Sequence, residues 1–171
     1  RSKIILKILN KLYPRTPIPL KHKNKFTLLV SVLLSAQTTD VNVNNVTKNI
    51  YPKYNKPKHF IKLGRKKIEK LIKSIGIFRM KAKSVYLLSK ILIKKHGGTV
   101  PQTFDELEKL PGVGHKTASV VMSQGFGQPA FPVDTHIHRL AQRWGLTNGK
   151  NVIQTEKDLK RIYPKKYWNK L

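Results

Sequence analysis

The chain contains no cysteine among its 171 residues. It can therefore form no disulfide, and it supplies no thiolates for a zinc site or an iron–sulfur cluster. Acidic residues are scarce as well: 8 Asp and Glu stand against 35 Lys and Arg, which gives a formal net charge of +27. A field of that sign attracts polyanions, of which nucleic acid is the commonest. The excess of Lys over Arg, with many Ile and Asn, is also typical of an AT-rich genome, so a merely solvated surface is the alternative.

Long apolar runs are lacking too. The longest, FTLLVSVLLSA at residues 26–36, is 11 residues long and is too short to cross a bilayer. It has neither the position nor the cleavage context of a signal peptide, so we expect a cytoplasmic protein. The chain begins at Arg1 rather than Met and ends at Leu171 without a stop pattern, so we expect a fragment at both ends.

No stretch shows the strict alternation of a half-buried strand, whereas apolar residues recur every three or four positions almost throughout. The sequence therefore predicts an all-α fold. Helices are expected over 2–13, 64–77, 81–96, about 115–123, 135–146 and 152–163. A core helix should include 26–36, and the helix after it should be capped by Asp40. Gly97 and Gly98 should stop the helix over 81–96, and a short helix from Thr103 to Leu110 should have a Thr103–Glu106 capping box.

The stretch LPGVGHKTASVVM, residues 110–122, predicts a tight turn between two helices. Pro111 ends the first helix, while Gly112 and Gly114 permit a positive φ and a close approach of the backbone to a ligand. The amides of Val113, Gly114 and the following helical turn are then expected to face outward as donors to a DNA phosphate. An ordinary αα-hairpin without a ligand is the alternative.

Two side chains are candidates for catalysis. Lys116 lies in the first turn of a helix that continues with small and apolar residues, so we expect this helix to be packed and the lysine to be partly buried. The helix dipole and the partial burial would then disfavour the ammonium form and favour a nucleophilic amine. Asp134 follows PAFPV and precedes THIHRL, where a carboxylate can cap the helix and still face a cleft. A solvated lysine and a plain N-cap are the respective alternatives.

Three histidines lie near these positions. His136 and His138 stand two apart, so on a helix they point to different faces, and the i,i+4 spacing of a helical zinc pair is missing. No metal site is therefore predicted. His115 is expected to make a polar or phosphate contact.

LPGVGHKTASVV followed by PVDTHIHRL resembles the helix-hairpin-helix, Gly/Pro-rich loop and aspartate signature of DNA glycosylases, and specifically the endonuclease III family. LLSAQTTD at 33–40 and GKNV at 149–152 match the same family, and the similarity covers nearly the whole chain. The resemblance implies an all-α helix-hairpin-helix glycosylase fold. Its six-helix barrel domain would span 18–128, with the hairpin at about 104–124, and a second, incomplete helical domain would combine 1–17 and 129–171, with DNA bound across the cleft between the two.

The resemblance also implies a function: a bifunctional DNA glycosylase and AP lyase of base excision repair. We expect a bacterial monomer that acts at the nucleoid on double-stranded DNA with an oxidised pyrimidine or an abasic site. Lys116 would form the Schiff base and Asp134 would be the catalytic carboxylate. Other DNA contacts would come from Gln37, which fills the gap left by the flipped nucleotide, from Ile77, which wedges from the other strand, and from Leu110, Pro111, Gly112, Val113, Gly114, His115 and Thr117. A helix-hairpin-helix module that binds DNA without chemistry is the alternative.

The resemblance stops short at the C-terminal end. In the family, a group of four cysteines that holds a [4Fe–4S] cluster follows soon after the counterpart of YPKKYWNKL, where this chain ends. No cofactor is expected in the chain as it stands. A [4Fe–4S] cluster is expected if the native chain continues beyond Leu171, and a cluster-free variant of the family is the alternative.

Overall fold

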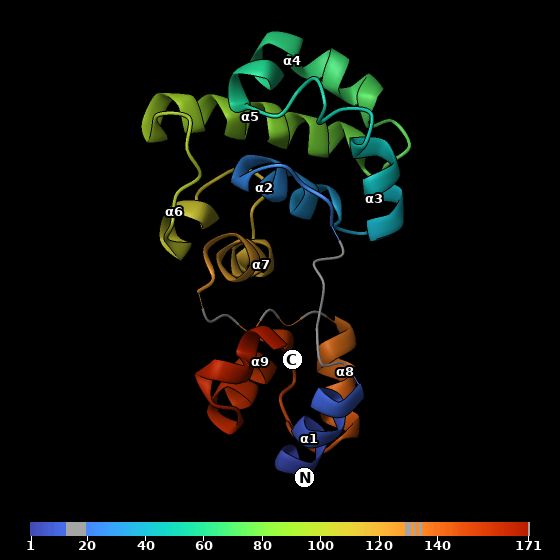
Figure 1. Ribbon diagram of the computed structural model, residues 1–171, viewed down its shortest axis with the longest axis vertical. Helices are drawn as coiled ribbons and strands as arrows, with labels where there is room; N and C mark the ends of the chain where they lie inside the picture. The colour runs from blue at the N-terminus through green and yellow to red at the C-terminus, as the bar shows by residue number, and fades with distance from the viewer. Residues whose placement is uncertain (13–19, 129–130, 132, 134, 171) are drawn as a thin grey trace. The chain divides into compact units, whose positions relative to one another are not determined.

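The computed structural model describes residues 1–12, 20–128, 131, 133 and 135–170, and in this range it holds helices and no strand (Figure 1). The predicted all-α fold is confirmed. The helices are α1 (Ser2–Leu12), α2 (Lys25–Leu34), α3 (Asp40–Thr47), α4 (Pro57–Leu71), α5 (Phe78–His96), α6 (Phe104–Glu108), α7 (His115–Phe126), α8 (Thr135–Arg143), α9 (Val152–Ile162) and the 3-10 helix η1 (Lys165–Lys170).

The helices belong to two compact units. We call Ile18–Val121 the core unit, and Arg1–Pro17 together with Met122–Leu171 the terminal unit. The expected domain boundaries after residues 17 and 128 adjoin residues outside the described part of the chain, and the domain division implied by the resemblance stays a prediction.

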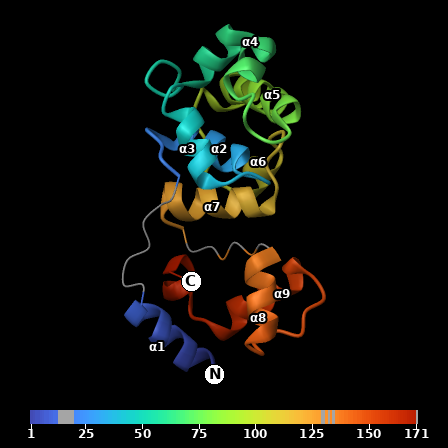
Figure 2. The ribbon, with the colours of Figure 1, turned by 90° about the vertical axis from the view of Figure 1, so that its right-hand side faces the viewer.

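Helix α2 occupies the centre of the core unit, between α5 on one side and α7 on the other (Figures 1 and 2). Every residue of α2 except Lys25 is buried, as its apolar composition predicts. Helix α5 packs on both α4 and α2, and α3 packs on α2. None of the described helices, α2 included, is long and apolar enough to cross a membrane.

The polar groups of the buried helix α2 are satisfied within the core unit. At its start, the Asn24 side chain accepts from Thr27 N at 2.9 Å while Thr27 Oγ1 accepts from Asn24 N at 2.9 Å, which forms a capping box. In its middle, the Tyr51 hydroxyl lies 2.6 Å from Ser31 Oγ and donates to Thr27 O at 3.0 Å. Burial raises the pKa of Tyr51, so its hydroxyl stays protonated and remains a donor.

The helix expected over 64–77 is displaced: α4 covers Pro57–Leu71 with a non-helical Gly64 inside it, and Ile77 is the N-cap of α5. The caps of α5, α6 and α3 confirm two expectations and correct a third. Gly97 ends α5 in the left-handed conformation, and the Thr103 side chain caps α6 by accepting from Glu106 N at 3.3 Å. The expectation that Asp40 caps the next helix is wrong. Thr39 is the N-cap and accepts from Asn42 N at 3.2 Å, so Asp40 is the first residue of α3, where its charge complements the helix dipole.

The terminal unit has a small core of its own. Phe131, Val133, Ala141, Leu159 and Tyr163 are buried together. Partly buried side chains from α1, α8, the loop after α8, α9 and η1 pack against them: Leu6, Ile137, Leu146, Val152, Ile162 and Trp168. Segments from both ends of the chain therefore share one hydrophobic core.

Replacing Tyr51 by Phe should lower the free energy of unfolding by about 1–2 kcal/mol, because it removes the hydroxyl that pairs with Ser31 and Thr27 inside the core. Urea titration followed by circular dichroism measures the change. The half-buried Tyr54, replaced by Phe, is the matched control and should change stability much less. Equal stability of wild type and Tyr51→Phe would show that the network contributes nothing.

Candidate functional site

The turn between α6 and α7 is fixed by Gly112. Its φ is +75°, and a Cβ at this position would lie 2.8 Å from Ser84 Cβ in α5 and 3.1 Å from Leu33 Cδ1 in α2. Both the backbone conformation and the available space therefore require glycine. The turn is held directly against the two helices at the centre of the core unit.

Two expectations about this turn need correction. Gly114 does not have a positive φ; its carbonyl accepts from Ala118 N at 3.0 Å, so it stands at the start of α7. The Val113 amide does not face outward, because it donates to Leu110 O at 3.2 Å within the turn. The side chains of Leu110 and Val113 are buried and that of Pro111 is half-buried, so these residues shape the turn mainly through packing.

A Cβ built on Gly114 meets no atom within 4 Å. The space in front of this residue is therefore open in the chain itself, unlike the space around Gly112. A ligand can therefore approach the main chain at the start of α7 closely, and the positive end of the helix dipole favours an anionic ligand.

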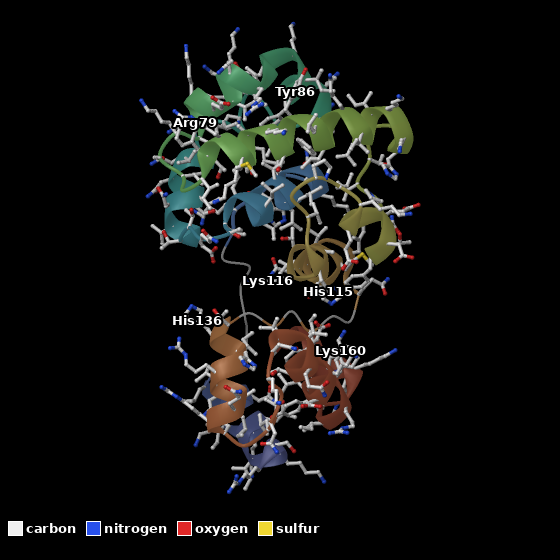
Figure 3. The ribbon with its side chains drawn as sticks, turned by 180° about the vertical axis from the view of Figure 1, so that it is seen from behind. Arg79, Tyr86, His115, Lys116, His136 and Lys160 are labelled. Carbon is white, nitrogen blue, oxygen red and sulfur yellow. The ribbon has the colours of Figure 1, made fainter. Side chains whose placement is uncertain are left out.

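Lys116 lies in the first turn of α7 and is exposed, beside the labelled His115 (Figure 3). The expected partial burial is not found, because Ala118, Ser119 and Val121 occupy the buried side of the helix. Thr117, the next predicted contact, is half-buried. An exposed amine at this helix start can reach a bound molecule without rearrangement of the core.

His115 is held in place from two sides. Its Nδ1 lies 2.6 Å from Glu108 Oε1, so its N–H donates to that carboxylate, and its ring stacks on Phe104 with centroids 5.6 Å apart. Both partners belong to α6. The histidine therefore ties the two helices of the hairpin together, which the sequence pattern did not indicate.

Gln37 and Ile77 share a rare backbone conformation. Their φ values are +57° and +56°, and among the described residues they are the non-glycine positions with a positive φ. Ile77 is also 52% exposed, although it is β-branched and apolar. Such strain persists only where the surroundings hold it, and it concentrates at functional sites.

The turns that carry these two residues lie side by side. A Cβ on Gly76 would be 3.5 Å from Gln37 O and 3.4 Å from Thr38 Oγ1, and the Asn42 side chain donates to Ser74 O at 3.2 Å. The structure therefore brings Gln37 and Ile77 to one place on the core unit. Leu33, which touches the hairpin turn, lies four residues before Gln37 on the same stretch of chain.

A buried cation beside these turns escaped the sequence analysis. Lys81 is 7% exposed, and its Nζ donates to Leu34 O at 2.9 Å, to Ala36 O, and to Thr38 Oγ1 at 3.3 Å. Burial lowers the pKa of Lys81. The available signal was its spacing: it shares the buried side of α5 with residues four, seven and eleven positions further on, Val85, Leu88 and Leu92.

Asp134 lies outside the described residues, so its expected role stays a prediction. The neighbouring His136 accepts from the Arg139 guanidinium at 3.1 Å, and His138 Nδ1 lies 2.6 Å from Thr155 Oγ1. In the described residues no group of three His, Cys, Asp or Glu side chains could hold a metal ion. The residues of this chain also do not fit an iron–sulfur cluster, because the chain has no cysteine.

Comparison with known proteins gives consistent matches. The family described as HhH-GPD superfamily base excision DNA repair protein matches residues 30–165. Endonuclease III of Bacillus subtilis is 46% identical over 159 residues, which cover 92% of this chain and 73% of the relative. Endonuclease III of Escherichia coli K12 is 42% identical over 165 residues, which cover 95% of this chain and 78% of the relative.

Among solved structures, a trapped endonuclease III–DNA covalent intermediate (the estranged-adenine complex) aligns with a TM-score of 0.94 at 43% identity, over 99% of this chain and 81% of that one. The family match spans most of the chain, and two curated relatives agree with the structural one. The chain therefore belongs to the endonuclease III family of the HhH-GPD base excision DNA repair proteins.

Proposed function

We propose that this protein is a bifunctional DNA glycosylase and AP lyase that removes oxidised pyrimidines through an imine on Lys116. Membership of the family supports the DNA glycosylase role. The observation that carries the rest is the position of Lys116, exposed in the first turn of α7 and directly after a turn that Gly112 fixes to the core. The relative trapped as a covalent intermediate with DNA supports a covalent step.

The first steps are base extrusion and attack on the sugar. A damaged base that stacks or pairs badly costs least to flip out of the helix. Lys116 Nζ, as the neutral amine, attacks C1′; the bond from C1′ to the base breaks and the base leaves with its electron pair and a proton. Asp134 would stabilise the positive charge that develops on the sugar and accept a proton from the amine.

The second stage cuts the strand. Loss of a further proton from nitrogen and opening of the sugar ring, with protonation of O4′, give an imine between Nζ and C1′. The imine makes the C2′ proton acidic; its removal expels the 3′ phosphate and breaks the C3′–O bond. Water then hydrolyses the imine and frees Lys116. The products are the free base, an unsaturated sugar on one fragment and a 5′ phosphate on the other.

DNA binding would use the charge and the two strained turns. The net charge of +27 favours the phosphate backbone, and the open space at Gly114 admits a phosphate to the start of α7. Gln37 would occupy the gap left by the extruded nucleotide, and Ile77, exposed and apolar, would wedge into the opposite strand. Neither side chain has to leave a hydrophobic core to do so.

Lys116→Gln should abolish covalent trapping, because an amide side chain forms no imine. The measurement is borohydride trapping with a duplex that contains an abasic site. The exposed Lys94 of α5, replaced by Gln, is the matched control and should trap as the wild type does. A wild-type protein that binds this DNA and is not trapped would instead favour a helix-hairpin-helix module without chemistry.

Asp134→Asn should slow release of an oxidised pyrimidine by about 100-fold or more, because the charge opposite the developing cation is lost. Asn caps helices as well as Asp, so folding and DNA affinity should be kept. Single-turnover assays of base release measure the rate. An unchanged rate would leave Asp134 as a helix cap.

Gly112→Ala and Gly114→Ala should separate folding from DNA binding. The first forces a side chain into a left-handed conformation 2.8 Å from Ser84 Cβ and should cost about 1–3 kcal/mol of stability. The second meets no atom within 4 Å and should leave stability within about 0.5 kcal/mol. Its methyl group faces the approaching phosphate, so affinity for duplex DNA should fall about tenfold, roughly 1.4 kcal/mol. Thermal melting and fluorescence anisotropy test the two effects, and wild-type affinity in Gly114→Ala would make the turn an ordinary connection.

A further inference from the structure

Lys81 makes hydrogen bonds with both strained turns. Its ammonium donates to Leu34 O, Ala36 O and Thr38 Oγ1, which surround Gln37 in the chain. Its backbone N–H donates to Ile77 O at 3.1 Å in the first turn of α5. The second bond is the ordinary helical one at the start of α5, so it is the ammonium that ties the Gln37 turn to the helix that begins after Ile77.

Packing alone does not explain a lysine at this position. An apolar side chain would fill the buried side of α5 without the cost of removing an ammonium from water. The three oxygens match the three donors of the charged group, and Leu34 is the last residue of α2, where a positive charge complements the helix dipole. The ammonium thus binds main-chain carbonyls at a helix end that has no helical partners for them.

Lys81 is unsuited to be a second nucleophile. Its Nζ is buried, and its hydrogens point to three acceptors. These contacts fix the conformation of the turn after α2 and leave no reactive atom exposed. Two further hydrogen bonds support this turn: the Ser35 hydroxyl donates to Val32 O at 2.7 Å, and Thr38 N donates to Ser35 O at 3.1 Å.

We propose that Lys81 is a positioning residue for lesion recognition, which holds Gln37 and Ile77 as a fixed pair so that both enter the DNA duplex together. The inference rests on the proposed function, which assigns these two side chains to the gap and to the opposite strand. A loose pair would have to be ordered each time the duplex is opened, and a displacement of about 1 Å can cost 100-fold in rate.

The test compares two abasic substrates, one single-stranded and one duplex, in single-turnover borohydride trapping. The single strand has no partner strand to separate and leaves no gap to fill, so it reports on Lys116 alone. Lys81→Met keeps most of the aliphatic side chain and removes the donors. We expect its rate on the duplex to fall about tenfold or more, while its rate on the single strand stays within about twofold of the wild type.

Lys83→Met is the matched control. Lys83 lies on the same helix and is exposed, and its replacement removes the same charge as Lys81→Met. It should behave as the wild type on both substrates. Coupling gives a second readout: in a Gln37→Ala background, Lys81→Met should cause little further loss on the duplex, because the side chain that it positions is already absent.

Thr38→Val is a milder variant that removes one acceptor of Lys81 from a half-buried position. It should show the same difference between substrates with a smaller amplitude, and it decides the question if circular dichroism shows that Lys81→Met does not fold. Equal slowing on both substrates, wild-type rates on both, or full additivity with Gln37→Ala would overturn the inference while leaving the proposed function intact. A wild-type protein that is trapped by neither substrate would overturn the proposed function and this inference with it.

Discussion

Helix α2 is enclosed by the rest of the core unit, and a helix in that position has no water to satisfy its polar groups. Three contacts replace water: Asn24 and Thr27 at the start, Tyr51 with Ser31 in the middle, and the Lys81 ammonium at the end. Thr27, Ser31, Tyr51 and Lys81 are buried, whereas Asn24 caps the helix from an exposed position. The direction in which the chain leaves α2, and hence the place of Gln37, depends on the last of these contacts.

The left-handed backbone at Gln37 and Ile77 follows from the same constraint. Each such residue costs about 1–3 kcal/mol, and the cost is met only where neighbouring contacts allow no relaxed alternative. Here the Lys81 ammonium ties the Gln37 turn to the start of α5, where Ile77 is the N-cap, and Asn42 adds a bond from α3 to Ser74. The hairpin turn is anchored to the same two helices, because Gly112 fits between Ser84 and Leu33. The buried core therefore determines the shape of the surface that we assign to DNA.

The features that the sequence predicted are those with a local cause. Apolar spacing located most of the helices and the near-complete burial of α2, although it displaced α4. Glycine located the end of α5, and the run from Leu110 to Lys116 located the hairpin. What it missed depends on contacts between distant residues. Lys81 is one of 35 basic residues, and its acceptors lie more than forty positions away in the chain. One miss has a local cause instead: the outward direction expected for the Val113 amide failed because the Leu110 carbonyl, three residues earlier, accepts its hydrogen bond.

The basic residues of this chain do two kinds of physical work. Exposed lysines act on phosphates through a field that salt screens within about 10 Å at 0.1 M, and they attract any nucleic acid regardless of damage. Lys81 is buried and its ammonium is already bonded to oxygens of the chain, so it is not available to pair directly with a phosphate. Selection of a damaged nucleotide requires the duplex to be opened, and opening requires rigid side chains more than charge. On our proposal, affinity for DNA is spread over the many exposed cations, whereas discrimination depends on the two strained turns and on Lys81, which lies buried between them.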